Sequence, residues 1–248
     1  MKRYVICTTP RSGSNHLCSL LESSGKMGHP SEFFNLQGTV HQLSEKHQLI
    51  EKGSTLKLNN YLSHIIDTHS TPNNTFGIKI FFNQLEKFIS FPEIKELFQQ
   101  SKFIFLTRKN IIAQAISMFI AEETNSWKSI NEEKGLRETV KYNQGRISEI
   151  LNNLIMQNIK WLNFFKINNL DYLEVTYESV LEDSNKVCQS ISKYCGFHEA
   201  LLIGNSKFQK QGDELNEEYL KKFIQNNKLY LNNKIDYPKI THDGLQII

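Results

Sequence analysis

The strongest constraint on the fold is a short apolar segment that changes into a polar loop and then into a helical pattern. Residues 3–8 (RYVICT) are apolar and β-branched, which predicts a strand. The loop Thr9-Pro10-Arg11-Ser12-Gly13-Ser14 follows, and from Asn15 onward leucines recur with helical spacing. A strand, a tight loop and a helix in this order are the first unit of an α/β fold.

The same alternation continues along the chain. We predict further strands over residues 75–81, 102–107 and 172–176, each a short apolar run. Helical patterns cover pieces of 41–70, residues 92–99, a helix after the N-cap Asn110, residues 136–165, and a last strong helix over 184–195 ended by Gly196. The expected architecture is a single domain, residues 1–248, with a P-loop-like parallel β-sheet flanked by helices on both faces.

Composition excludes several classes of function. A net charge of +3 is too small for a dedicated nucleic-acid binder, and no apolar run is long enough for a transmembrane segment or a signal peptide. The four cysteines (Cys7, Cys18, Cys188, Cys195) contain no C-x-x-C pair and no zinc-ligand pattern. We therefore expect free buried thiols, a cytoplasmic protein and no metal.

The first loop has the properties of an anion site. Backbone N–H groups and the positive end of the helix dipole converge where residues 9–15 enter the helix, and Arg11 adds a cation there. The loop lacks the Walker A lysine, and the strand over 102–107 ends in Arg108 where an NTPase would place a magnesium-binding aspartate. Positive side chains must therefore neutralise the bound phosphate. Arg108, with Ser117 on the next helix, offers a second phosphate site.

These motifs resemble those of sulfotransferases that use 3′-phosphoadenosine-5′-phosphosulfate (PAPS). More specifically, the chain is similar to the bacterial trehalose 2-sulfotransferase family, in motifs that run in the same order along most of the sequence. They are RSGS from Arg11, GHPSEFF from Gly28, GIK from Gly77, RKNIIAQAIS from Arg108 to Ser117, then Trp127, Tyr177 and the tail segment Lys210-Gln211-Gly212-Asp213.

The resemblance implies a role for each matching residue. The first loop, Arg11 to Asn15 (Arg11, Ser12, Gly13, Ser14, Asn15), would bind the 5′-phosphosulfate, and Arg108 with Ser117 would bind the 3′-phosphate. Tyr177, Lys210, Gln211 and Gly212 complete the expected cofactor-binding set. Glu32, in the family's E-F-F motif, would be the general base that takes a proton from a sugar hydroxyl. The implied product is 3′-phosphoadenosine 5′-phosphate (PAP), and related enzymes suggest a homodimer.

The chemistry of sulfuryl transfer calls for these residue types. An attacking alcohol needs a base, which a carboxylate supplies, and the leaving phosphate needs positive charge, which Arg11 and the helix N-terminus supply. Lys79 lies between Ile78 and Ile80, and at the end of its strand it can contact cofactor or substrate or form a salt bridge. Trp127, Phe33 and Phe34 are candidates for stacking on a sugar or adenine, with a core position as the alternative.

Two segments depart from the family pattern, residues 35–71 and 126–137, and such loops shape an acceptor pocket. The acceptor, whether a trehalose-like sugar, a glycolipid or a polysaccharide, is therefore left open. Lys210 also stands where an arginine is expected, which keeps the charge and loses the planar fork. Two rival functions remain: a nucleotide-dependent small-molecule kinase, and a nucleotide-binding protein without catalysis.

Overall fold

The computed structural model describes residues 1–47, 50–51, 55–127, 139–206, 214–227, 240–241 and 244–245. Its centre is one four-stranded parallel sheet in the order β4-β1-β5-β6. The strands are β1 (Lys2–Thr8), β4 (Thr75–Phe81), β5 (Lys102–Thr107) and β6 (Tyr172–Thr176). All four strands occur where the sequence predicts them, because each is a short, mainly apolar segment of the kind that a covered parallel sheet contains. Two short hairpins, β2 (Ile50–Glu51) with β3 (Thr55–Leu56) and β7 (Ile240–Thr241) with β8 (Gly244–Leu245), lie outside this sheet.

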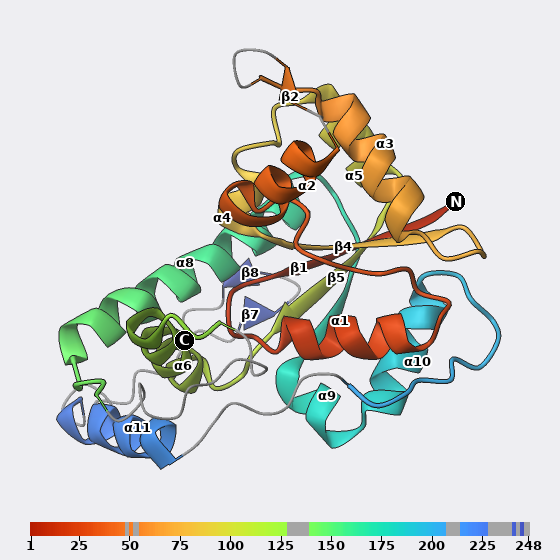
Figure 1. Cartoon of the computed structure of the whole chain (residues 1–248). Helices are drawn as coiled ribbons and strands as arrows, with labels where there is room; N and C mark the ends of the chain where they lie inside the picture. The colour runs from red at the N-terminus through yellow and green to blue at the C-terminus, as the bar shows by residue number, and fades with distance from the viewer. Residues whose placement is uncertain are drawn as a thin grey trace.

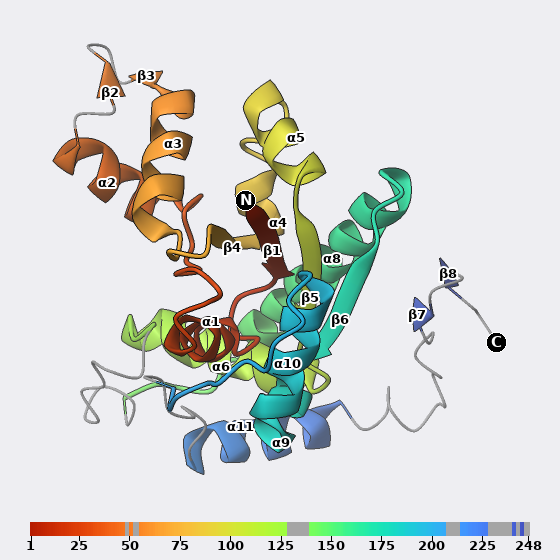
Figure 2. The ribbon, with the colours of Figure 1, turned by 90° about the vertical axis from the view of Figure 1, so that its right-hand side faces the viewer.

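Helices cover both faces of the sheet, as predicted (Figures 1 and 2). One face carries α1 (Ser14–Ser23), α9 (Tyr177–Glu182) and α10 (Ser184–Tyr194). The other carries α3 (Leu58–His69), α4 (Phe82–Leu85), α5 (Pro92–Gln99) and the second half of α8 (Gln144–Ile167). The π-helical turn η1 (Leu36–Val40) and α2 (His41–Lys46) adjoin α3, while α6 (Ile111–Thr124) and α11 (Glu214–Asn226) pack beside the first half of α8.

Strand alternation divides the core between the two faces. In β1, Tyr4 and Ile6 pack toward α1 and α10, whereas Val5 and Cys7 pack toward α3, α5 and α8. All four side chains are at most 1% exposed. A strand buried on both faces must be apolar at every position, so its sequence shows a continuous run without polar alternation.

The helices differ from the predictions in two respects. The long helix begins at Gln144 and not near residue 136, because Asn143 caps it by accepting a hydrogen bond from the Arg146 N–H. The helix over 184–194 is also not the last one, since α11 follows it. The buried rings of Tyr219 and Phe223 fasten α11 to the cluster formed by α6 and α8.

The four cysteines are free and buried, as predicted. Among the residues that the structure describes, none of the helices has the length and apolar character needed to span a membrane.

Candidate active site

The loop after β1 has the geometry of an anion site. We call residues 9–14 the anion loop. Arg11 and Gly13 both have left-handed backbones, with φ of 62° and 80°, and α1 starts at Ser14 without a side-chain cap. A Cβ on Gly13 would lie 2.2 Å from Cδ2 of Tyr177, so only glycine fits against that ring. The uncapped first turn directs N–H groups and the helix dipole toward the loop.

Side chains from three other elements hold the anion loop. The hydroxyls of Thr8 and Ser12 lie 2.6 Å apart, and Thr8 also donates to the carbonyl of Leu106 in β5. Gln114 of α6 donates to the Pro10 carbonyl at 2.6 Å, and Trp161 of α8 donates its indole N–H to the Thr8 carbonyl at 3.0 Å. These donors and acceptors are buried or nearly so, and buried hydrogen bonds fix the loop conformation before any ligand binds.

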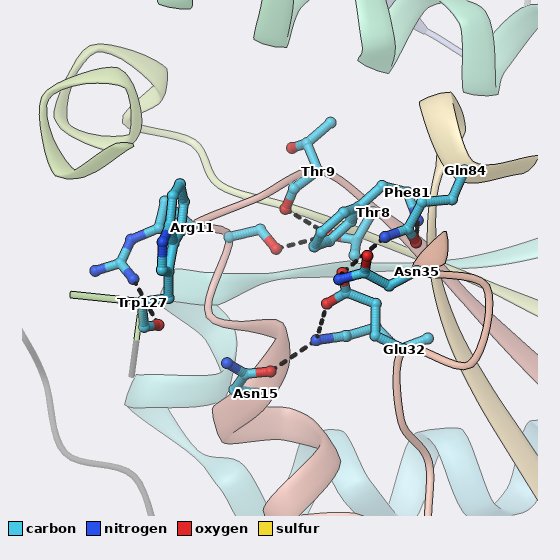
Figure 3. Close-up of polar contacts among 11 residues, drawn as sticks. Thr8, Thr9, Arg11, Asn15, Glu32, Asn35, Phe81, Gln84 and Trp127 are labelled. Carbon is cyan, nitrogen blue, oxygen red and sulfur yellow. Dashed lines mark hydrogen bonds and ion pairs between the residues drawn. The ribbon is translucent and has the colours of Figure 1, made fainter. Parts of the chain in front are cut away.

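The two predicted phosphate motifs meet at the carboxyl edge of the sheet. Arg11 donates from Nε to the Ser117 hydroxyl at 3.0 Å. It also donates from Nη1 to the Trp127 carbonyl at 3.1 Å (Figure 3). Arg108, directly after β5, donates from Nη1 to the Arg11 carbonyl at 3.3 Å. The structure therefore brings together residues that are about a hundred positions apart in the sequence.

Arg108 keeps hydrogen-bonding capacity that the described residues do not use. Its guanidinium lies 4.9 Å above the centre of the Tyr177 ring, and its buried Nε has no hydrogen-bond partner in the described part of the chain. Burial lowers the pKa of Arg108 from its ordinary value, although an arginine remains charged at neutral pH. A buried guanidinium with an unused donor fits a bound anion, and Tyr177 lies where it can flank that anion.

Glu32 is brought to the site by pairing beside β4. Ser31 forms a parallel bridge with Ile78, and its carbonyl accepts from the Lys79 N–H at 2.9 Å. The turn before it needs glycine, because Gly28 has φ of 72° and a Cβ there would lie 2.9 Å from the Thr75 carbonyl. This pairing places Glu32 directly beside Lys79.

A cluster of polar side chains surrounds the Glu32 carboxylate (Figure 3). We call Glu32, Lys79, Gln84 and Asn35 the Glu32 cluster. The Lys79 ammonium lies 2.9 Å from Oε2 of Glu32, and Gln84 donates to Oε1 at 2.7 Å. Lys79 also donates to Oδ1 of Asn15, in the first turn of α1, at 2.7 Å. Lys79 is only 4% exposed, so these partners stabilise a charge that would otherwise be costly to bury.

The remaining predicted residues have different positions. Phe33 and Phe34 are at most 1% exposed in the core, where Phe33 packs against Phe76, so they form the wall behind the site and do not line its surface. Trp127 is 43% exposed and adjoins Arg11 through its backbone carbonyl. Lys210, Gln211 and Gly212 lie outside the described residues.

The sequence did not indicate three residues of the site: Gln84 and Asn35, the two amides of the Glu32 cluster, and Gln114 beside the anion loop. Gln84 belongs to a helix of four residues, and Asn35 precedes η1 in a segment without a family motif. Gln114 is fully buried and holds the anion loop. A polar residue on an otherwise buried helix is the one signal that could have identified it.

Comparison with known proteins identifies relatives over most of the chain. Residues 3–226 match a family model described as Stf0 sulphotransferase. A trehalose 2-sulfotransferase from Mycobacterium tuberculosis is 22% identical over 254 residues, covering 90% of this chain and 94% of the relative. Another from Mycolicibacterium smegmatis is 21% identical over 254 residues, covering 89% and 93%.

Solved structures with a similar arrangement include a sulfotransferase from Alicyclobacillus acidocaldarius. It has a TM-score of 0.48 and 11% identity, and the match covers 91% of this chain and 92% of that one. A retinol dehydratase in a complex with retinol and PAP gives a TM-score of 0.44 and 14% identity, with coverage of 95% and 82%.

Proposed function

The chain belongs to the Stf0 sulphotransferase family, and we propose that it transfers a sulfuryl group from PAPS to a hydroxyl of a carbohydrate, with Glu32 as the general base. The observation that carries this proposal is the contact chain from Glu32 through Lys79 to Asn15. It joins a carboxylate to the first turn of the helix that follows the anion loop. A base and an anion site side by side are what sulfuryl transfer to an alcohol requires.

The residues of the anion loop fit the phosphosulfate end of the donor. The uncapped start of α1, the left-handed Gly13 and the guanidinium of Arg11 would hold it, and PAPS supplies the transferable sulfuryl group when bound. Arg108 and Ser117 would hold the 3′-phosphate, since the unused Nε of Arg108 is a donor that a phosphate can satisfy. Tyr177 would flank it.

Glu32 serves as the base in this proposal. An ionised carboxylate can accept the proton of a hydroxyl as that hydroxyl attacks, and this group contributes typically 10²- to 10⁴-fold to a rate. The carbohydrate class is suggested by the names of the two mycobacterial relatives. A homodimer and a cytoplasmic location stay predictions.

Calorimetric titration of the full chain with PAP, 5′-AMP and ATP tests the donor. We expect PAP to bind more tightly than 5′-AMP. Arg108→Ala should weaken the binding of PAP by about 10- to 100-fold, because a charged hydrogen bond contributes about 1.5–3 kcal/mol. The binding of 5′-AMP, which lacks the 3′-phosphate, should stay nearly unchanged.

Arg3→Ala is the matched control for loss of one positive charge, because Arg3 lies near the amino end of β1, at the opposite end of the strand from the anion loop. Equal or tighter binding of ATP, with no dependence on Arg108, would contradict the proposal and support the kinase alternative.

A further inference from the structure

The Glu32 cluster contains an amide whose orientation the structure determines. Gln84 is buried, and its Oε1 accepts from the backbone N–H of Phe81 at 3.1 Å. A backbone N–H can only donate, so the oxygen of Gln84 must face Phe81 and its NH₂ group must face Glu32. That NH₂ group donates to Oε1 of Glu32 at 2.7 Å.

Asn35 repeats this arrangement from the other side of the carboxylate. Its Oδ1 accepts from the Gly38 N–H at 3.2 Å, which leaves its NH₂ group to donate to the same Oε1 of Glu32, at a longer 3.4 Å. Two amides from separate segments therefore converge on one carboxylate oxygen, and each has its own oxygen occupied by a backbone N–H (Figure 3).

The donors are distributed unequally over the carboxylate. An ionised carboxylate has about four acceptor sites, two on each oxygen. Gln84 and Asn35 occupy both sites on Oε1, whereas Lys79 occupies one site on Oε2 at 2.9 Å. Among the contacts of the described residues, Oε2 is thus the oxygen that retains a site for a further proton.

We propose that Gln84 is a positioning residue that, with Asn35, holds Oε1 of Glu32 so that Oε2 accepts the proton of the acceptor hydroxyl. The inference rests on the proposed function, in which Glu32 is the base. The hydroxyl proton forms a bond to Oε2, the electron pair of the broken O–H bond stays on the attacking oxygen, and Glu32 becomes a neutral acid. Gln84 acts through Glu32 and contacts neither reactant.

The ionisable groups near Glu32 allow a clean test. Lys79 of β4 is the cation that faces it. The thiol of Cys18 in α1 is also within electrostatic reach, but burial raises its pKa to about 12 and keeps it neutral at ordinary pH. Removal of the Gln84 amide therefore changes the environment of Glu32 without changing the charge of a neighbour.

The test compares Gln84→Met and Gln84→Glu with the wild-type chain by ¹³C NMR of the glutamate carboxyl carbons, without donor or acceptor. The signal of Glu32 is assigned by its loss in Glu32→Gln. Loss of a charge-assisted hydrogen bond changes the electron distribution of the carboxylate, so at one neutral pH the Glu32 signal should lie at a different chemical shift in Gln84→Met than in the wild-type chain. Gln84→Glu keeps an oxygen for Phe81 and places a second carboxylate against Glu32, so its shift should be larger.

Gln100→Met is the matched control, because Gln100 is exposed and donates to Glu96 in the same way. It should leave the Glu32 signal unchanged. With PAPS and trehalose as the probe acceptor, Gln84→Met should lower kcat by about 5- to 20-fold, within the effect of removing a hydrogen bond to a charged group, and leave the KM for PAPS unchanged.

A Glu32 signal at the same chemical shift in the wild-type chain and both Gln84 variants would overturn the inference. The proposed function has a separate readout, which is the binding of PAP to the wild-type chain. Failure of that binding would contradict the proposed function while the NMR comparison still decided whether Gln84 positions Glu32.

Discussion

The Glu32 cluster and the anion loop lie next to each other, but their charged groups have different partners. In the Glu32 cluster the carboxylate is paired with Lys79 and bonded by an amide on its other oxygen. Beside the anion loop, the Arg108 guanidinium donates to the backbone carbonyl of Arg11, which is a neutral oxygen, and its Nε has no hydrogen-bond partner among the described residues.

This difference indicates what each region is built to do. A carboxylate with a cation and amides around it is stabilised and oriented within the protein. A guanidinium bonded to a neutral oxygen, as that of Arg108 is, retains a positive potential, which favours an anionic ligand. The first region thus orients a reactive group, while the second offers charge to a ligand. Three predictions test the contrast.

Glu32→Gln should have the largest effect, and that effect should be on catalysis and not on binding of the donor. We expect sulfated product from PAPS and the acceptor to form about 10²- to 10⁴-fold more slowly, because a base is removed while the shape is kept. PAP affinity, measured by calorimetry, should change by less than about threefold, because Glu32 is not among the residues that we propose hold PAPS.

Glu86→Gln is the control for this change, because Glu86 is a partly exposed carboxylate paired with Lys160 outside the Glu32 cluster. Full activity in Glu32→Gln would show that Glu32 is not the base, and that the Glu32 cluster does not orient a reactive group.

Gly13→Ala should destabilise the fold more than the same change at Gly25. Both glycines are left-handed, with φ of 80° and 64°, so both substitutions carry a backbone cost of about 1–2 kcal/mol. Only at Gly13 would the new Cβ collide with Tyr177, whereas nothing lies within 4 Å at Gly25. The collision should add about 1–3 kcal/mol to the loss in unfolding free energy. Urea unfolding measures the difference, and equal losses would refute a close contact between Gly13 and Tyr177.

Lys79→Met combined with Glu32→Gln measures the link between the two regions. The Lys79 side chain is 5% exposed and that of Glu32 21%, so each single change leaves a poorly solvated partner behind. The loss of unfolding free energy in the double variant should be smaller, by about 1–2 kcal/mol, than the sum of the losses in the two single variants. A double-mutant cycle by urea unfolding tests this, and strict additivity would mean that the pair is not coupled.

The strands and the anion loop could be read from the sequence because they depend on neighbours in the chain. Residues 103–106 are apolar at every position, which a doubly covered strand requires, and Gly13 marks a backbone turn at the start of a helix. The start of α8 could not be placed as well, because the cap by Asn143 competes with a helical pattern that continues upstream.

The environment of Glu32 could not be read in this way. Gln84 is 52 positions from Glu32, and nothing in a four-residue helix indicates which carboxylate its amide will contact. The same limit applies to Phe33, for which the sequence leaves both a stacking role and a core position open. Its ring is buried against Phe76 because the segment that carries it runs beside β4.

The sequence by itself determined the parallel α/β architecture, the anion loop after β1 and the arginine after β5, since hydrophobic runs and glycine conformation act locally. Only the tertiary structure decided that Lys79 bridges Glu32 and Asn15, and that Gln84 and Asn35 share one carboxylate oxygen. Hydrogen bonds depend on distances of about 3 Å between atoms, and such distances between remote residues arise only when the sheet and its helices pack together.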